Sequence, residues 1–335
     1  MIGFRTKLDI PAADSLLGHQ HRIMLIGSCF SDSIGQKLLS DGFRVLINPF
    51  GVLYNPVSIA NNLQLLLDNQ PHDLQEIKFN KSNYYHFNYH STFSGDKPEE
   101  VLEKINHQLA IGREFLKSSD YLIITLGSAY TYHHLSSPEP VANCHKIPDK
   151  EFSVRMLTQD EIVNRFKQLL VNIRKLRPDL RILFTISPVR HWKYGAHGNQ
   201  LSKAVLLLAV DEIIRQNPEY CSYFPSYELI MDELRDYRFY TEDMLHISNL
   251  AVDYIYEQFS SSYMDKATRQ IAGEIAAIWQ ASRHRVMHPG TSGHERFLQT
   301  QIEKIQKIKD LYPEIDVDYL SKYFENQLRE IRKLA

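Results

Sequence analysis

The sequence predicts a doubly wound α/β fold, a parallel sheet with helices on both faces, followed by a helical extension at the C-terminal end. Short apolar runs alternate along the chain with longer stretches of helical periodicity, which is the pattern of β-α-β units. The apolar runs are continuous and rich in β-branched residues, as strands buried on both faces of a parallel sheet are. After about Ser262 no strand pattern remains.

Five apolar runs are the candidate strands of this sheet. Four of them are continuous, and the fifth is weaker because a proline interrupts it. The runs are Arg22–Gly27, Phe43–Asn48, Tyr121–Gly127, Arg181–Ser187 and, as the weaker candidate, Cys221–Glu228. Ligands of such sheets bind at the carboxyl ends of the strands, so the residues that follow each run are the ones to examine for function.

Helical periodicity fills the segments between the strands. Apolar residues recur there at three- and four-residue steps, and Pro56, Pro98 and Thr158 suit helix starts. The predicted helices are 31–39, 56–67, 98–116, 158–176, 201–215 and 249–259, and in the extension 264–285, 295–311 and 317–333. We therefore expect two domains, an α/β domain over residues 1–262 and a helical extension over 263–335 that packs on the α/β domain or forms a dimer surface.

The composition limits the classes of partner. The 335 residues carry a formal net charge of -2, with 43% apolar and 23% charged residues, which is typical of a soluble globular protein. This balance gives no electrostatic reason to expect nucleic acid or a membrane surface. No apolar run is long enough to span a membrane, and the N-terminus lacks the apolar core of a signal peptide. Three sparse cysteines fit a reducing compartment, so a cytoplasmic location is expected.

Two residues that can act as nucleophiles follow the first predicted strand. Ser28 and Cys29 stand after Gly27, at the start of a predicted helix. A helix N-terminus can lower the pKa of a thiol and hold an oxyanion. In the alternative interpretation, Ser28 or Ser31 caps the helix and Cys29 packs as a small apolar residue. The spacing alone leaves both open.

A D-x-x-H pair follows the last strand candidate. Asp243 and His246 lie three residues apart, so the carboxylate can bind Nδ1 of the imidazole and leave Nε2 to act as a base. The pair precedes the helix over 249–259, which places it at the same edge of the sheet as Gly27.

Two polar loops at this edge offer binding residues. "VANCHKIP" contains Asn143, which can donate to an oxyanion, and Lys146, which can hold an anionic group; a solvated loop is the alternative. The segment from Ser187 to Lys203 is predicted to be a loop of more than ten residues, a length more typical of a functional loop than of a connector. Its candidate binding residues are Arg190, His191, His197 and Asn199.

The histidines do not form a recognisable metal motif. His133 and His134 are adjacent, and His284 and His288 stand in "HRVMH", which lacks the glutamate of an H-E-x-x-H site. Neither stretch adds a carboxylate. We therefore expect no metal ion and no organic cofactor.

Taken in order, the motifs resemble those of the GSCFA-domain family, which is named for a Gly-Ser-Cys-Phe-Ala signature. The motifs are "IGSCF", "NPFG", "LGSAY", "NCHK", "SPVRHW", "HGNQLSK", "YFPSYE" and "FYTEDMLH". The resemblance covers roughly residues 4–259, and Ser31 takes the place of the final alanine of the signature. The family is similar to the SGNH (GDSL-like) hydrolase superfamily, which implies a flavodoxin-like three-layer α/β/α fold.

The resemblance also implies roles. In the superfamily a Gly-Asp-Ser turn carries the nucleophile, a glycine after the second strand helps to build the oxyanion hole, and a D-x-x-H motif supplies acid and base. By position, Cys29 matches the nucleophilic serine, Ser28 the aspartate and Gly51 the glycine, while Asp243 and His246 match D-x-x-H. Either Cys29 is the nucleophile, or the turn is shifted and Ser28 is. A Gly-Asn-Cys turn in related-looking capsule-polysaccharide acyl-transfer proteins favours the thiol.

A second departure concerns the oxyanion hole. The superfamily has Gly-x-Asn after the third strand, whereas this chain has Gly127-Ser128-Ala129, so Asn143 or a backbone N–H is expected to replace the missing amide. Three functions remain open. The first is hydrolysis of an O-acyl ester, such as an O-acetyl group on a carbohydrate. The second is acyl transfer from acyl-CoA to a sugar hydroxyl, and the third is a catalytically silent module that binds a glycan or a protein.

Overall fold

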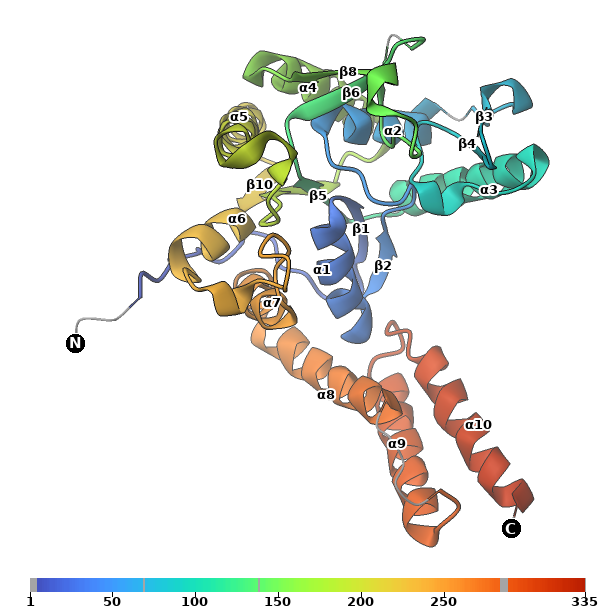
Figure 1. Cartoon of the computed structure of the whole chain (residues 1–335). Helices are drawn as coiled ribbons and strands as arrows, with labels where there is room; N and C mark the ends of the chain where they lie inside the picture. The colour runs from blue at the N-terminus through green and yellow to red at the C-terminus, as the bar shows by residue number, and fades with distance from the viewer. Residues whose placement is uncertain (1–4, 69, 138, 284–288, 335) are drawn as a thin grey trace. The chain divides into compact units, whose positions relative to one another are not determined.

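A computed structural model describes residues 5–68, 70–137, 139–283 and 289–334, and it contains the predicted sheet (Figure 1). The strands are β1 (Arg22–Gly27), β2 (Arg44–Ile47), β5 (Tyr121–Leu126), β9 (Arg181–Ile186) and β10 (Cys221–Phe224). Their order is β10-β9-β5-β1-β2, and the pairs β10–β9, β9–β5 and β5–β1 are parallel. This is the flavodoxin-like order, so the predicted fold class is confirmed. The order reverses between β1 and β5, where ligands of this fold bind.

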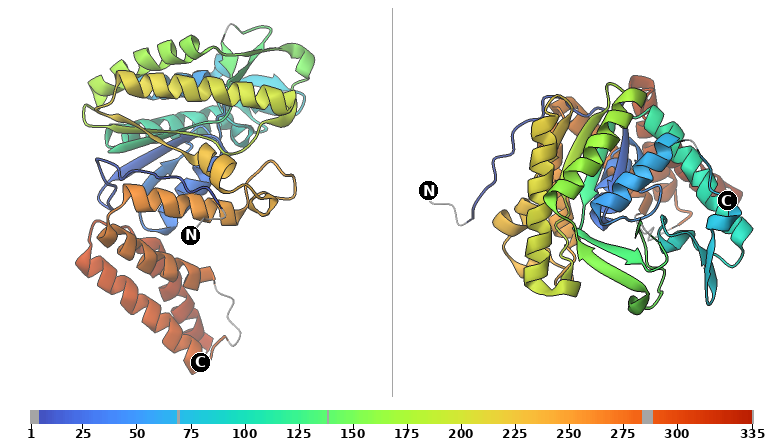
Figure 2. Two further views of the ribbon diagram at one scale, coloured as in Figure 1. Left: turned by 90° about the vertical axis from the view of Figure 1, so that its left-hand side faces the viewer. Right: turned by 90° about the horizontal axis from the view of Figure 1, so that it is seen from above.

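Helices cover both faces of the sheet (Figure 2). On one face α4 packs between α2 and α5, and α3 packs beside α2, while α1 and α7 lie on the other face (Figure 1). Their bounds are α1 (Cys29–Ser40), α2 (Pro56–Asp68), α3 (Pro98–Lys117), α4 (Gln159–Leu176), α5 (Gly195–Gln216) and α7 (Asn249–Tyr263). Thr158 and Glu161 form a capping box at the start of α4, as the helix-start signal predicts.

The core between these layers explains the continuous apolar runs. Every residue from Ile23 to Ile26 in β1 is fully buried, and in β5 the six residues are all buried. The side chains of a central parallel strand point into a helical layer on either face, so no polar alternation is expected along it.

Two small antiparallel sheets are not foreseen in the sequence. A hairpin joins β3 (Lys78–Asn80) to β4 (Asn83–Tyr85), and a second sheet has the order β7-β6-β8. Its strands are β6 (Tyr130–His134), β7 (Pro140–Val141) and β8 (Phe152–Met156). These strands are short and partly exposed, so they lack the continuous apolar runs by which the central strands were recognised.

Helix starts at the carboxyl edge of the sheet differ from the prediction. The helix after β1 begins at Cys29, two residues before the predicted start at Ser31. The long loop predicted from Ser187 to Lys203 is wrong in its second half, because α5 already begins at Gly195. Short helical turns complete the fold: 74–76, 91–93, 149–151, 192–194, 226–228 (α6), 229–233 and 237–239.

The chain forms two compact units. One contains Ile23–Gly35 and Leu46–Gln258 with the start of the chain, and the other contains Ala12–Arg22, Gln36–Val45 and the segment from Phe259 onward. The second unit holds α8 (Lys266–Arg283), α9 (Ser292–Leu311) and α10 (Asp318–Leu334) around an apolar core of its own. The boundary at 262/263 remains a prediction. Within the described residues, no helix combines the length and hydropathy needed to cross a membrane.

Candidate functional site

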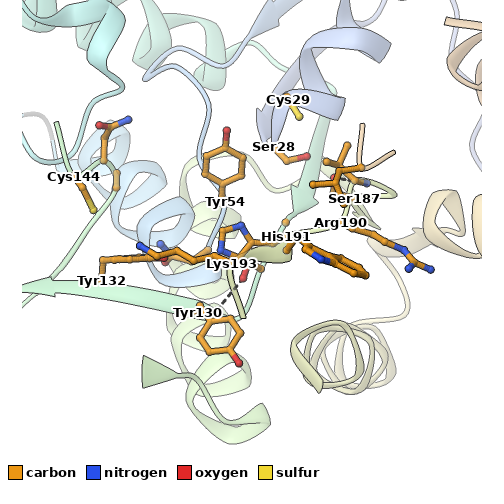
Figure 3. A pocket seen from close by; sticks show the side chains of 18 of the residues that line it. Ser28, Cys29, Tyr54, Tyr130, Tyr132, Cys144, Ser187, Arg190, His191 and Lys193 are labelled. Atoms are coloured by element: carbon orange, nitrogen blue, oxygen red, sulfur yellow. Dashed lines mark hydrogen bonds between the residues drawn. The ribbon is translucent and has the colours of Figure 1, made fainter. Parts of the chain in front are cut away.

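A cavity of about 510 Å³ opens where β1, β5 and β9 end, at the reversal of strand order (Figure 3). Ser28, Cys29, Gly127, Ser128 and Ser187 line it from the residues that follow these strands. The rest of its wall comes from neighbouring segments: Tyr54, Asn55, Tyr130, Tyr132, Val141, Ala142, Asn143, Cys144, Val189, Arg190, His191, Trp192, Lys193, Leu245 and His246. The sequence-predicted edge of the sheet is therefore a concave site.

The turn after β1 separates the roles of the two candidate nucleophiles. Gly27 has φ +141°, and a Cβ there would lie 2.1 Å from the Thr125 carbonyl oxygen, so only glycine fits between β1 and β5. Ser28 is 1% exposed, and its Oγ accepts the N–H of Phe30 at 3.3 Å. Cys29 is the first residue of α1 and is partly exposed in the cavity. The hydroxyl thus caps the helix, and the thiol is available to a ligand.

The groups around Cys29 shift the pKa of its thiol in opposite directions. Burial raises the pKa of its thiol, and the carboxylate of Asp32 acts in the same direction. The backbone N–H groups of Cys29 and Phe30, with the ammonium of Lys203, act to lower the pKa of Cys29. The net direction is upward, so the thiol is protonated at rest and needs a base to become a nucleophile.

Asn48 ties the turn to α1 and was not identified from the sequence. Its Oδ1 accepts the N–H of Gly27 at 2.8 Å, and its Nδ2 donates to Asp32 at 2.6 Å. Asn48 has φ +42°, a left-handed conformation that asparagine tolerates better than most residues. Burial raises the pKa of Asp32, and the hydrogen bond from Asn48 partly offsets this rise.

Asp243 and His246 form the hydrogen-bonded pair that their spacing predicts. Oδ2 of Asp243 lies 2.6 Å from Nδ1 of His246, and Oδ1 accepts the backbone N–H groups of Leu245 and His246 and the Thr241 hydroxyl. The hydrogen bond from His246 is the largest of the effects that lower the pKa of Asp243. His246 lines the same cavity as Cys29, and the backbone N–H of Arg190 donates to Leu245 at 3.4 Å.

The two residues predicted for the oxyanion hole have different positions. Gly51 does not line the cavity, and its N–H donates to the carbonyl of Asn48 at 2.8 Å. A Cβ at Gly51 would lie 2.3 Å from Cβ of His90, so close packing is the reason for glycine there. Asn143 does line the cavity. Its Oδ1 accepts the N–H of His145 at 2.8 Å, which leaves its NH₂ group as the donor available to a ligand.

The predicted binding residues are only partly brought together. Arg190 and His191 line the cavity, whereas Lys146 and His197 are exposed and lie outside its lining. Asn199 is buried behind the wall, where its Oδ1 accepts the N–H of His191 at 3.0 Å. It therefore positions the segment that carries His191 instead of touching a ligand.

An aromatic wall was not foreseen in the sequence. Tyr130 stacks on Tyr194 with ring centroids 4.0 Å apart, and the Tyr194 hydroxyl donates to that of Tyr132 at 2.9 Å. In Figure 3, Tyr54 and His191 project into the middle of the view, and Tyr130 lies below them. Because Tyr130 and Tyr132 belong to the unpredicted strand β6, no sequence pattern indicated that they face the site.

Lys203 is a further residue of the site without a predicted role. It is 1% exposed, and its Nζ donates to the carbonyls of Gly127 at 2.8 Å and Ser187 at 2.6 Å. A signal for it exists in the sequence, because Lys203 shares the buried stripe of α5 with Leu206, Val210 and Ile213 at helical spacing. A charged residue in such a stripe is rare unless it has a function.

A possible metal-ligand cluster lies away from the cavity. Donor atoms of His72, Glu76 and His86 all lie within 4.8 Å of one another. The N–H of Asn88, however, donates to Nδ1 of His86 at 3.1 Å, so the ring proton of neutral His86 is on Nε2. That N–H faces Glu76 at 3.4 Å, and Nδ1 of His72 lies 2.9 Å from the same oxygen. The two imidazoles therefore hold a carboxylate, and they lower its pKa to about 2.

Of the other histidines considered for a metal, only His133 and His134 are among the described residues. His133 and His134 lie in β6, where Nδ1 of His134 contacts the Ser136 hydroxyl at 2.7 Å. His284 and His288 are outside the described residues.

Comparisons with known proteins identify a family. The GSCFA family model matches residues 22–259, and the model of the C-terminal domain of GSCFA domain proteins matches residues 275–330. No curated protein matches the chain. The solved structures found in the comparison resemble it only distantly, with TM-scores below 0.5.

Three of these structures are esterases. A carbohydrate esterase family 2 enzyme from Corynascus thermopiles (Myceliophthora fergusii) is 12% identical, with 80% of this chain and 69% of that chain covered, at a TM-score of 0.37. A family two carbohydrate esterase from Clostridium thermocellum is 14% identical, with 75% of this chain and 65% of that chain covered, at a TM-score of 0.33. An acetyl xylan esterase from Butyrivibrio proteoclasticus is 9% identical, with 76% of this chain and 64% of that chain covered, at a TM-score of 0.34. This chain spans about two thirds of the length of each.

Proposed function

The chain belongs to the GSCFA family, and we propose that it is an acyl-ester hydrolase whose nucleophile is the thiol of Cys29. One observation carries the proposal: Cys29, at the first position of a helix, and His246, held by Asp243, line one cavity. A nucleophile, a base and a group that orients the base are the parts that covalent acyl transfer needs.

The resting thiol determines the first step. Since burial keeps Cys29 protonated, Nε2 of His246 takes its proton as Sγ forms a bond to the acyl carbon. Asp243 accepts the Nδ1–H of His246 and stabilises the imidazolium that results. The carbonyl oxygen becomes an oxyanion at the N-terminus of α1, where the N–H of Cys29 and the NH₂ group of Asn143 are the proposed donors.

The second half of the cycle reverses the proton transfer. The tetrahedral intermediate collapses, the C–O bond breaks, and His246 gives its proton to the leaving alkoxide. A thioester on Cys29 remains. Water then attacks this thioester as His246 takes its proton, and the C–S bond breaks to release the acid. His246 returns the proton to the departing Sγ, which restores the thiol and the neutral imidazole. These steps require neither an electron acceptor nor a metal ion.

The cavity wall supports a carbohydrate ester as the substrate. Tyr54, Tyr130, Tyr132 and Trp192 offer aromatic faces of the kind that pack against sugar rings, and Arg190 and His191 add polar groups that can fix orientation. An O-acetyl group is the proposed acyl part, because a small acyl chain leaves most of the 510 Å³ for the sugar.

The test is turnover of short-chain aryl esters by the purified protein and its variants. We expect Cys29→Ala to lower kcat by about 10³-fold or more, while Ser28→Ala keeps most of the activity because its buried hydroxyl accepts the N–H of Phe30 and caps α1. Cys221→Ala is the matched control, since it removes a buried thiol of β10 outside the cavity. Activity that survives in Cys29→Ala and disappears in Ser28→Ala would transfer the role to Ser28.

One observation favours the catalytically silent alternative. The pKa of Cys29 is raised, whereas activated thiols have a lowered pKa. If the wild-type protein turns over neither aryl esters nor acyl-CoA with added sugar, while glycans bind in the cavity, the chain is a binding module. Consumption of acyl-CoA that requires the sugar would instead identify a transferase, for which Arg190 and Lys193 can bind phosphate.

A further inference from the structure

Lys203 is an unusual residue for the interior of a protein. Its side chain is buried in α5 with 1% exposure, and two of its three N–H groups donate to backbone carbonyls. In the described part of the chain, no carboxylate forms an ion pair with it. A buried cation without a counter-ion is expensive, and such groups are retained mainly where a function uses the charge.

The position of Lys203 relates it to the cavity. Its two acceptors are Gly127 and Ser187, the residues that follow β5 and β9, and both line the cavity. The ammonium therefore lies directly behind the cavity wall, between the ends of two neighbouring strands. No Asp or Glu is among the lining residues, so the wall offers no negative charge to balance it.

The groups that interact with this ammonium come from three elements. They are Cys29 at the start of α1, Arg190 and His191 in the segment after β9, and Tyr227 of α6, whose ring centre lies 5.5 Å from Nζ. Of these, Cys29 is the one that becomes an anion during the proposed reaction. The charge of Lys203 favours that anion, since it acts to lower the pKa of the Cys29 thiol.

We propose that Lys203 is a positioning residue of the thiol site, whose buried ammonium stabilises negative charge on Sγ of Cys29 and on the tetrahedral intermediate from behind the cavity wall. It takes over part of the role of the amide that is absent after Gly127, and it exchanges no proton with the substrate. The inference rests on the proposed function for its catalytic part, whereas its electrostatic part is measurable without any substrate.

The experiment follows alkylation of Cys29 by iodoacetamide in the full-length protein over pH 6–9. Peptide mass spectrometry distinguishes Cys29 from Cys144 and Cys221. Lys203→Gln keeps an N–H donor but loses the charge, and Lys167→Met removes a lysine from the exposed face of α4 as the control. At pH 6 we expect the rate of alkylation of Cys29 to be about 10-fold lower in Lys203→Gln than in wild type, which corresponds to a rise of about one unit in the pKa of the thiol. The rate in Lys167→Met should equal that of wild type.

The wild-type profile provides a second measurement that needs no folded variant. Burial lowers the pKa of Lys203 to about 7, so the charge is present below that pH and is lost as the pH rises through it. The rate of alkylation of Cys29 should therefore rise tenfold per pH unit below about pH 7. Over about one pH unit above it the rate should stay nearly constant, because the loss of the Lys203 charge offsets the gain in thiolate, and then it should rise again. A merely structural lysine would give a uniform slope.

The outcomes separate the two proposals. Equal rates in Lys203→Gln and wild type at pH 6, or a uniform slope in the wild-type profile, would overturn the inference even if Cys29→Ala abolishes ester turnover. Conversely, the expected alkylation behaviour without any ester turnover would leave the electrostatic role of Lys203 in place and reject the hydrolase. Lys203→Gln should also lower kcat by about 10-fold with KM unchanged, because the charge acts on the transition state.

Discussion

At the scale of single residues, the site consists of a thiol that is not activated at rest and a histidine that is fully oriented. Cys29 is kept protonated by burial, whereas His246 is held by a carboxylate whose second oxygen accepts two backbone N–H groups. In the proposed reaction the imidazole must therefore supply the activation, and that reaction should be sensitive to anything that alters the Asp243–His246 pair.

Replacing Asp243 tests this dependence. Asp243→Asn has a single acceptor oxygen, which cannot accept both the backbone N–H groups that Oδ1 binds and the Nδ1–H that Oδ2 binds. With the NH₂ group facing Nδ1, the preferred tautomer of the base is lost, so we expect kcat to fall about 10³-fold with little change in KM. Steady-state kinetics with an aryl ester measure this. The control is Asp236→Asn, an exposed aspartate paired with Arg238, which should leave the rate within about twofold. A loss smaller than tenfold in Asp243→Asn would contradict the assigned role.

Residue patterns predicted the Asp243–His246 hydrogen bond and the place of Cys29 at the edge of the sheet, but not the rest of the cavity wall. Cys29, Asp243 and His246 were found because a motif fixes their order along the chain. Gly51 was assigned to an oxyanion hole by resemblance, yet its N–H is engaged by Asn48 and close packing against His90 explains the glycine. Asn48 acts through contacts between segments far apart in sequence, which local patterns do not record. Lys203 has a local signal in the buried stripe of α5, but its acceptors Gly127 and Ser187 come from other segments.

At the scale of elements, the turn between β1 and α1 positions the candidate nucleophile. It places Cys29 at the first helical position because Gly27 adopts φ +141° against the backbone of β5. The five central strands could be predicted, since buried parallel strands have a distinctive apolar pattern. The strands β6 to β8, which carry part of the aromatic wall, could not, because half-exposed short strands resemble loops.

Gly27→Ala tests the packing of this turn. The added Cβ would lie 2.1 Å from the Thr125 carbonyl oxygen, so the strand ends must separate, and we expect the free energy of unfolding to fall by about 3 kcal/mol or more. Chemical denaturation followed by circular dichroism measures the change. Gly273→Ala in α8 is the matched control, because its Cβ meets no atom within 4 Å and alanine favours helix, so it should be neutral or stabilising. Equal stability of Gly27→Ala and wild type would reject this account of the turn.

At the scale of the whole molecule, the two compact units are not two consecutive stretches of sequence. Ala12–Arg22 and Gln36–Val45 belong to the same unit as the C-terminal helices. Within that unit, the N–H of Leu17 donates to Tyr263 at 2.7 Å, and Gly42 faces Ile275 and Ile315. A division of the chain into independent domains at residue 262, as composition and periodicity suggest, would separate these partners.

A truncated chain tests this arrangement. Residues 1–262 alone lose the partners of Leu17 and Gly42, and they leave apolar side chains exposed that are buried in the full chain. We expect this fragment to unfold at a Tm at least about 5 °C lower than the full chain, or to aggregate. Thermal unfolding followed by circular dichroism compares the two. A fragment with the Tm of the full chain would show that the sequence-based boundary delimits an independent domain.

The central claim is that Cys29 carries the acyl group during the reaction, and trapping that intermediate tests it most directly. The full-length protein is mixed with excess aryl acetate at neutral pH, quenched with acid within a second, and analysed by peptide mass spectrometry. The account predicts one acetyl group, on the Cys29 peptide, which is absent in Cys29→Ala and does not form in His246→Gln. An acetyl group on Ser28, or rapid turnover by Cys29→Ala, would contradict it.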